Sequence, residues 1–326
     1  MKAPFPYMGG KSSIAHIVWD ALGDVAHYIE PCFGSGAVLL NRPAWHKRRM
    51  ETVNDKDGHI ANVWRSLQYN PDEVAKWCDW PVNHADLMAR KSELIDEQDE
   101  LLSKLVNDTM YCNPKLAGYW IWCDSCWIGA GMLCPTQRPN VGDNKGINSR
   151  IPRLSKGFQG IQNKTFYNAE LGIDNPHVPD PYKPGLYVWF RELSERLRKV
   201  RVVCGDWSRV CGGDWQDNSG TCGIFFDPPY SDKANRSKNI YAEDSLTVAH
   251  DIAKWALERG KKSSYLIVLA GYYEEHDWLL DEGWSMVRWQ ARGGYANKGS
   301  GQGKVNKTRE ALFLSPHCIQ SQKELF

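Results

Sequence analysis

An aspartate, two prolines and a tyrosine close an apolar run in the stretch IFFDPPYS, residues 224–231. The Asp227 carboxylate and the Pro228 carbonyl can accept hydrogen bonds, and prolines restrict the backbone so that such acceptors stay in place. Tyr230 offers an aromatic face on which a planar ring can stack. This group is suited to holding a planar ring that carries hydrogen-bond donors. The candidate catalytic residues are therefore Asp227, Pro228, Pro229 and Tyr230.

Short β-rich runs alternate with helix-like segments along much of the chain. The β-rich runs are residues 25–30, 50–53, 200–206, 222–227, 264–271, 284–290 and 310–315, and the clearest helix-like segments are 186–200 and 245–260. Such alternation predicts an α/β fold with a mainly parallel sheet that is covered on both faces. Ligands bind these sheets at the carboxyl ends of the strands, so we expect the polar residues that close the runs to share one edge.

A glycine-containing turn follows the first β-rich run, in IEPCFGSGAV at residues 29–38. Gly34 and Gly36 let the backbone approach a ligand closely, and the helix after them presents unpaired amide groups. Asp55 comes 19 positions after Gly36, near the spacing at which an acid reaches the hydroxyls of a bound ribose. The third glycine of the dinucleotide fingerprint is missing, which favours a nucleoside without a pyrophosphate. The alternative is that Asp55 is a surface turn residue.

Nearly 150 residues separate the second β-rich run from the third, which is far too many for a crossover between strands. The stretch contains an amphipathic helix candidate at residues 85–108 and becomes loop-rich from about Pro135 to Ala169. We therefore predict an inserted subdomain over residues 66–185, and a main domain formed by residues 1–65 and 186–326.

Two segments are rich in basic residues and could contact nucleic acid. In the loop-rich part of the insert these residues are Arg138, Lys145, Arg150, Arg153, Lys156 and Lys164, and near the end of the chain they are Arg292, Lys298, Lys304, Lys307 and Arg309. Positive charge among glycine and polar residues suits contacts to phosphates and base edges. A solvated connector in the insert and a hairpin connector near the end are the alternatives.

Composition limits the remaining possibilities. The chain has 326 residues, 42% of them apolar, and a net charge of +1, so a polyanion must be met by a local patch. No stretch is long enough to span a membrane and the N-terminus lacks a signal peptide, which predicts a cytoplasmic protein. Ten cysteines favour buried thiols over disulfides. The cluster Cys112, Cys123, Cys126 and Cys134 is interpreted as packing, with zinc as the less favoured alternative, and no metal is expected.

Five motifs together resemble the Dam-like, alpha-class DNA adenine N6-methyltransferases. They are PYMGGK at 6–11, EPCFGSG at 30–36, NDKD at 54–57, CGDW at 204–207 and DPPY at 227–230. The resemblance implies a Rossmann-like class I methyltransferase sheet with an inserted, mostly helical or loop subdomain for target recognition. It also implies methyl transfer from S-adenosylmethionine to the 6-amino group of adenine in duplex DNA after base flipping. An RNA adenine methyltransferase is the nearest alternative, and a non-catalytic nucleic-acid-binding protein is a further one.

The resemblance also assigns roles to individual residues. Lys11 would lie beside the cofactor carboxylate, Asp55 would hold the ribose, and Asp206 with Trp207 would lie against the cofactor adenine. The full set of expected cofactor-binding residues is Tyr7, Gly10, Lys11, Glu30, Phe33, Gly34, Gly36, Asp55, Asp206 and Trp207. Asp227 and the Pro228 carbonyl would hold the target amine, and Tyr230 would stack on the flipped base. The expected location is the bacterial cytoplasm, for a protein encoded either by the bacterium or by a phage that infects it.

Overall fold

The computed structural model describes residues 1–5, 7, 10–47, 49–108, 110–127, 132–133, 185–218, 220–229, 248–289 and 309–319. The chain divides into two compact units, each treated by itself below. The helical unit comprises Met1–Tyr7, Lys56–Arg198 and Asn239–Ala242, and the sheet unit comprises Met8–Asp55, Lys199–Lys238 and Glu243–Phe326. Candidate residues that lie outside the described residues are Tyr230, Cys134, Arg138, Lys145, Arg150, Arg153, Lys156, Lys164, Arg292, Lys298, Lys304 and Lys307.

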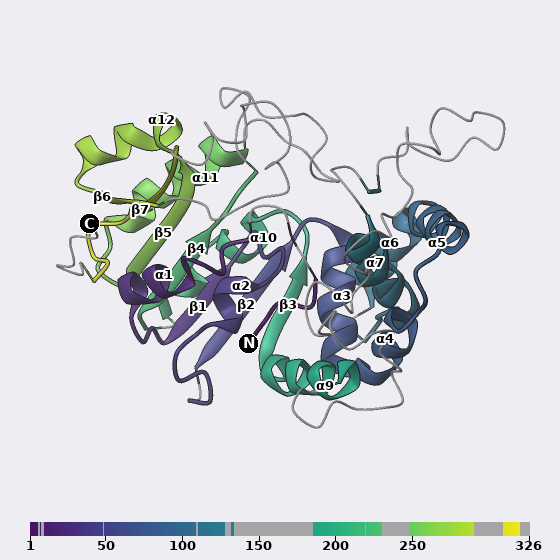
Figure 1. The fold of residues 1–326 in the computed structure, drawn as a ribbon. Coiled ribbons are helices and arrows are strands. Elements are labelled where there is room, and N and C mark those ends of the chain that lie inside the picture. The colour runs from purple at the N-terminus through teal and green to yellow at the C-terminus, as the bar shows by residue number, and fades with distance from the viewer. Residues whose placement is uncertain are drawn as a thin grey trace. The chain divides into compact units, whose positions relative to one another are not determined.

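The sheet unit is built on a seven-stranded sheet in the order β3-β2-β1-β4-β5-β7-β6 (Figure 1). The strands are β1 His27–Glu30, β2 Met50–Asp55, β3 Val200–Cys204, β4 Cys222–Phe226, β5 Tyr265–Tyr272, β6 Ser285–Arg288 and β7 Glu310–Leu314. The first five strands pair in parallel, whereas β7 runs antiparallel to both β5 and β6. The expected α/β fold with a mainly parallel sheet is therefore confirmed.

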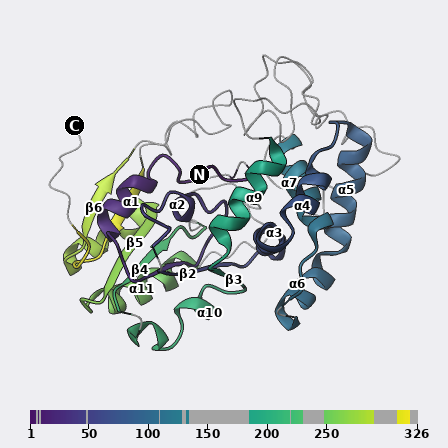
Figure 2. The ribbon, with the colours of Figure 1, turned by 90° about the horizontal axis from the view of Figure 1, so that it is seen from below.

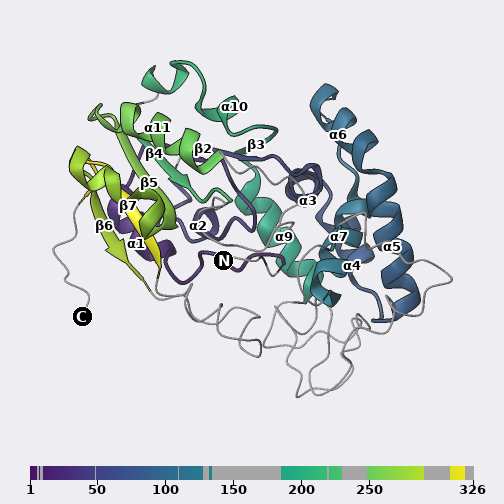
Figure 3. The same cartoon turned by 90° about the horizontal axis from the view of Figure 1, so that it is seen from above.

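Helices lie on both faces of this sheet. The α-helices are α1 Ala15–Leu22, α2 Ala37–Leu40, α10 Ser208–Cys211, α11 Val248–Gly260 and α12 Tyr273–His276, and the 3-10 helices are Trp215–Asn218 and Asp277–Glu282. Figure 2 and Figure 3 show α1 and α2 on one face, with α10 and α11 on the other. Side chains alternate along a strand, so Tyr28 contacts Trp19 of α1, while Ile29 joins the buried cluster of α10 and α11.

The helical unit packs six α-helices of the described chain around a core rich in tryptophan. They are α3 Gly58–Tyr69, α4 Pro71–Cys78, α5 His84–Asp96, α6 Gln98–Asn107, α7 Pro114–Cys126 and α9 Leu186–Leu197. Helix α3 begins at Asp57, whose carboxylate accepts hydrogen bonds from the backbone N–H groups of His59 and Ile60. The helix expected over residues 85–108 is interrupted at Glu97 and forms α5 and α6. The contacts of α9 with α3 and α4 place this helix in the helical unit.

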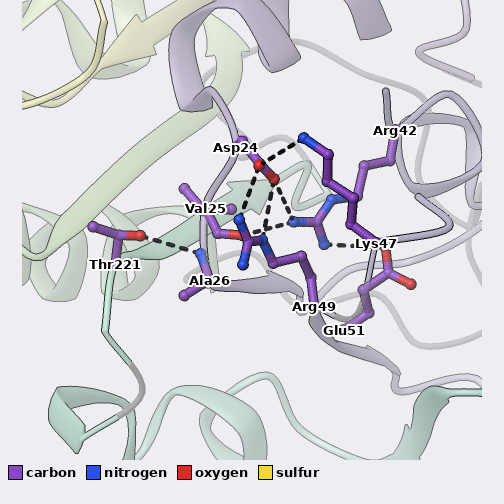
Figure 4. A network of polar contacts seen from close by, with 8 residues as sticks. All are labelled: Asp24, Val25, Ala26, Arg42, Lys47, Arg49, Glu51 and Thr221. Carbon is purple, nitrogen blue, oxygen red and sulfur yellow. Dashed lines mark hydrogen bonds and ion pairs between the residues drawn. The ribbon is translucent and has the colours of Figure 1, made fainter. Parts of the chain in front are cut away.

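A polar network joins the segments at the amino ends of β1 and β2 (Figure 4). The buried Arg42 guanidinium lies 3.1 Å from the Glu51 carboxylate and donates a hydrogen bond of 2.7 Å to the Val25 carbonyl. Exposed Lys47 and Arg49 pair with Asp24 at 3.5 and 3.0 Å. Arg42 thus fixes the end of α2 against the starts of both strands, which orients the β1–α2 turn at the opposite edge.

None of the helices among the described residues has the length and apolar character needed to cross a membrane.

We expect Arg42→Met to lower the free energy of unfolding by about 3 kcal/mol, because a buried carboxylate loses the cation beside it. The exposed Lys47→Met should change it by less than about 1 kcal/mol. Urea denaturation followed by circular dichroism measures both. Equal losses in the two variants would show that burial of the Arg42–Glu51 pair does not matter.

Candidate active site

The carboxyl ends of β1 and β4 meet at the centre of the sheet, where the chain order reverses. From β1 the chain continues to β2 on one side, and from β4 it continues to β5 on the other. Such a switch point is where open α/β sheets bind their ligands, because the two outgoing connections diverge and leave room between them. Glu30 ends β1 and Asp227 follows β4, so both stand at this point.

The turn after β1 is held by the end of β2. The Gly34 N–H donates to the Asp55 carboxylate at 2.8 Å, and the Phe33 N–H donates to the Asn54 carbonyl at 3.0 Å. Gly34 and Gly36 have φ angles of +48° and +63°, which side-chain-bearing residues rarely adopt. The structure therefore brings the predicted glycine turn and the predicted acid into direct contact at the carboxyl edge, where Gly34 and Gly36 are themselves buried.

Asn54 connects three strand ends and was not predicted as a site residue. Its amide nitrogen donates to the Pro31 carbonyl and to the Gly205 carbonyl, each at 2.9 Å. The side chain is 1% exposed. Asn54 thus positions the segments after β1 and β3 relative to the end of β2. Its only sequence signal was its place beside Asp55 at the end of a β-rich run.

Lys11 and Asp227 form an ion pair of 2.9 Å. Lys11 is 4% exposed and the Asp227 side chain 22% exposed. Burial raises the pKa of Asp227, and the Lys11 ammonium opposes this rise. Lys11, which was expected beside a cofactor carboxylate, is therefore paired with the candidate catalytic carboxylate. Its ammonium also lies 5.9 Å from the centre of the Trp289 ring.

Glu30 is a buried acid one strand away from Asp227. The Tyr28 hydroxyl donates to its Oε2 atom at 2.8 Å. Burial raises the pKa of Glu30 well above its usual range, and the negative charges of Asp227 and Asp55 raise it further. A carboxyl group in this environment tends to hold its proton, which limits the negative charge gathered at this edge.

Asp206 and Trp207 lie between β3 and α10, directly before the first residue of this helix. The exposed Asp206 carboxylate accepts hydrogen bonds from the Ser208 N–H at 3.0 Å and from the Ser208 hydroxyl at 2.6 Å. Trp207 is half-buried and packs edge-on against Phe226 and Trp255 at 6.2 and 6.1 Å between ring centres. The two residues leave a polar carboxylate and an aromatic edge beside the end of β3.

The remaining candidates are distributed as follows. Pro228 is buried and Pro229 is half-buried directly after Asp227, whereas Gly10 is exposed. Tyr7 belongs to the helical unit, where its ring contacts Phe5 at 6.1 Å between centres. The structure thus brings Lys11, Asp227 and Glu30, and the Gly34–Asp55 contact, to one edge of the sheet unit.

The cysteines of the helical unit are arranged as packing residues. Cys123 and Cys126 are buried in α7, and the Asn70 amide donates to the Cys112 sulfur at 3.3 Å. Within the part of the chain that the structure describes, no three histidine, cysteine or acidic residues lie close enough together to hold a metal ion.

The edge carries groups that can hold a nucleoside-type ligand and a planar amine. The Asp55 carboxylate can accept hydrogen bonds from hydroxyl groups, and the Asp227 carboxylate can accept them from amine groups. Comparison of the chain with models of known protein families gives no match, and comparison with curated proteins gives none either.

We expect Glu30→Gln to gain stability relative to the unchanged protein as the pH rises from 5 to 8. The raised pKa of Glu30 gives a stabilising contribution that is complete below the unfolded pKa and is lost as the pH passes through the folded pKa. The variant has no carboxyl group at this position and therefore does not lose this contribution as the pH rises. The loss in the unchanged protein amounts to about 1.4 kcal/mol of unfolding free energy for each unit by which the folded pKa of Glu30 exceeds the unfolded pKa.

Urea unfolding at the two pH values measures the effect, with Asp24→Asn as the control. The pKa of Asp24 is lowered to about 2, chiefly by its hydrogen bond from Arg49, so the effect of this control should be the same at both pH values. A pH-independent difference for Glu30→Gln as well would contradict the assignment.

Proposed function

We propose that this protein is an S-adenosylmethionine-dependent DNA methyltransferase that modifies the 6-amino group of adenine. The observation that carries the proposal is the largely buried Lys11–Asp227 pair at the switch point of the sheet, one strand from the Gly34–Asp55 contact. Such a pair contributes little to the stability of the folded protein, because removing two charges from water costs several kcal/mol. Burial of this kind is common where a carboxylate must act on a ligand.

The order of the strands supports a class I methyltransferase sheet. Its first five strands follow the order of an open nucleotide-binding sheet, and an antiparallel strand is inserted between β5 and β6. This arrangement is the one that the resemblance to the Dam-like enzymes implies. It supports the proposal more specifically than an α/β fold alone would.

The residues at the edge fit S-adenosylmethionine in chemical type. Asp55 would accept hydrogen bonds from the ribose hydroxyls, and the Gly34–Gly36 backbone would pass under the methionine part. Asp206 and the edge of Trp207 would lie against the adenine ring. The bound cofactor supplies an electrophilic methyl group, and the residues of this chain supply its position and the acceptors for the substrate.

Asp227 would act on the target amine. The lone pair of an adenine amino group is delocalised into the ring, so hydrogen bonds from its two hydrogens to Asp227 and to the Pro228 carbonyl would draw the nitrogen toward a pyramidal geometry. Lys11 holds the Asp227 Oδ1 atom at 2.9 Å and favours the ionised form of the carboxylate despite its burial. Lys11 is therefore proposed to orient Asp227 rather than to bind the cofactor carboxylate.

Duplex DNA as the substrate is proposed from the resemblance and from the basic segments in the sequence. A base inside a duplex cannot reach a methyl donor held at a sheet edge, so the adenine would be flipped out and stacked on Tyr230. An enzyme of this kind works where the genome lies, and we therefore propose the bacterial cytoplasm as its location.

The test is mass spectrometry of nucleosides after incubation with isotopically labelled S-adenosylmethionine. The substrates are a pool of unmethylated duplexes that contains every six-base sequence and, in parallel, structured RNA. Labelled N6-methyladenine from DNA alone is the expected result. Label in RNA alone would favour the RNA enzyme, and label in neither would contradict the proposed reaction.

Asp227→Asn should lower the rate of methyl transfer by at least about 100-fold, because the variant keeps a neutral oxygen acceptor but loses the negative charge that polarises the amine and the group that takes its proton. Single-turnover kinetics measures this rate on the unmethylated form of the duplex that becomes labelled in the pool. Asp24→Asn, at the opposite edge of the sheet, serves as the matched control and should keep it. A normal rate in Asp227→Asn would rule out the proposed role.

Asp55→Ala should weaken binding of S-adenosylmethionine by at least about tenfold, because the ribose loses a charged hydrogen-bond acceptor. Isothermal titration calorimetry measures the affinity. Asp55→Asn keeps an oxygen for the Gly34 N–H and separates the loss of charge from the loss of the turn contact. Unaltered affinity in Asp55→Ala would remove this residue from the cofactor site.

A further inference from the structure

A further acidic residue lies at the same edge as Asp227 because β7 runs antiparallel to its neighbours. Glu310 is the first residue of β7 and pairs with Tyr272, the last residue of β5. In an antiparallel strand the first residue, not the last, reaches the carboxyl edge of its parallel neighbours. Trp289, directly after β6, reaches the same edge and lies near the Lys11 ammonium.

The Glu310 side chain is half-buried, and one of its two carboxyl oxygens has no hydrogen-bond donor among the described residues. Its Oε2 atom is shielded from water and accepts no hydrogen bond from the described residues. Burial raises the pKa of Glu310, the Lys11 ammonium lowers it, and the Asp227 carboxylate raises it. Both members of the ion pair therefore lie within electrostatic reach of Glu310.

The neighbouring arginine does not explain this placement. The Arg309 guanidinium pairs with Glu274 at 3.2 Å and lies 4.5 Å from the centre of the Tyr272 ring. Glu310 thus lies at the same edge as the Lys11–Asp227 pair, opposite Tyr272. A buried carboxyl oxygen with no donor among the described residues costs free energy, which favours a functional reason for its presence.

We propose that Glu310 is a positioning residue of the methyl-transfer site, which shares the Lys11 ammonium with Asp227 and makes the Asp227 carboxylate a better proton acceptor. The inference rests on the proposed function. When ionised, Glu310 competes for the positive charge of Lys11 and repels the negative charge of Asp227. Both effects strengthen hydrogen bonds that Asp227 accepts from the target amine.

The transfer step accounts for each bond and for the proton. The amino nitrogen forms a bond to the methyl carbon, and the bond from that carbon to sulfur breaks with its electron pair remaining on sulfur. The N–H proton then passes to Asp227 and from there to solvent. Glu310 touches none of the reacting atoms and acts through Lys11 and Asp227.

Carbon-13 NMR of labelled carboxyl groups tests the coupling without any substrate. The pKa of Glu310 should lie above its usual range in the unchanged protein and should be lower in Asp227→Asn. The variant removes a nearby negative charge, so the Lys11 ammonium acts on Glu310 without a competing carboxylate. Asp24→Asn, at the opposite edge of the sheet, should leave the titration of Glu310 unchanged. Identical titration of Glu310 in the unchanged protein and in Asp227→Asn would overturn the inference.

Kinetics of Glu310→Gln tests the role in the reaction. The variant should lower kcat about tenfold with little change in KM for S-adenosylmethionine. The acid limb of its pH–rate profile should move to lower pH, because Asp227 loses a repelling charge, while Glu30, Cys32 and Asp55 remain as titratable groups at this edge. Glu310→Asp should recover part of kcat.

The two possible failures are distinguishable. A wild-type rate and an unshifted profile in Glu310→Gln would overturn the inference while the proposed function stands. Absence of methyl transfer by the unchanged protein would overturn the proposed function, and the NMR titration would still decide whether Glu310 is coupled to Asp227.

Discussion

Lys11 and Asp227 form an ion pair that is largely withdrawn from water, and the organisation of the sheet unit makes this pair possible. Each charge would be costly to bury alone, and the pair requires that the segment before α1 be held against the end of β4. Several carboxyl groups gather around this one ammonium. The raised pKa values of Glu30, Glu310 and Asp227 follow chiefly from their burial, which the Lys11 ammonium opposes at Glu310 and Asp227.

The amino edge and the carboxyl edge of the sheet carry different kinds of polar contact. At the amino edge, Arg42, Glu51 and the Val25 carbonyl satisfy one another, and the pairs of Asp24 with Lys47 and Arg49 are exposed to water. At the carboxyl edge, Asn54 and Asp55 are directed into the turns after β1 and β3. The first edge fixes the strands, and the second gathers the carboxylates that we propose act on a ligand.

Local sequence patterns were sufficient to predict the parallel strands and to single out the glycine turn and Asp55. Apolar runs closed by polar residues predicted the parallel strands, and the spacing from Gly36 to Asp55 assigned the turn and the acid to one expected ligand site, where the structure shows a hydrogen bond from the Gly34 N–H to Asp55. The Lys11–Asp227 pair was not predicted, because it joins residues 216 positions apart whose local motifs indicate separate roles. Glu310 was missed because the reversed direction of β7 is decided by strand pairing, which the run EALFLS does not reveal. The interruption at Glu97 was missed because the residues around it favour a helix.

We propose that the ends of β1, β2 and β3 bind the methyl donor. Amide hydrogen exchange of the protein with and without saturating S-adenosylmethionine, followed by peptide mass spectrometry, tests this binding site. We expect slower exchange in peptides covering residues 30–36, 54–57 and 204–207, with little change in α5 and α6. Unchanged exchange at residues 30–36 and 54–57 under saturating cofactor would contradict it.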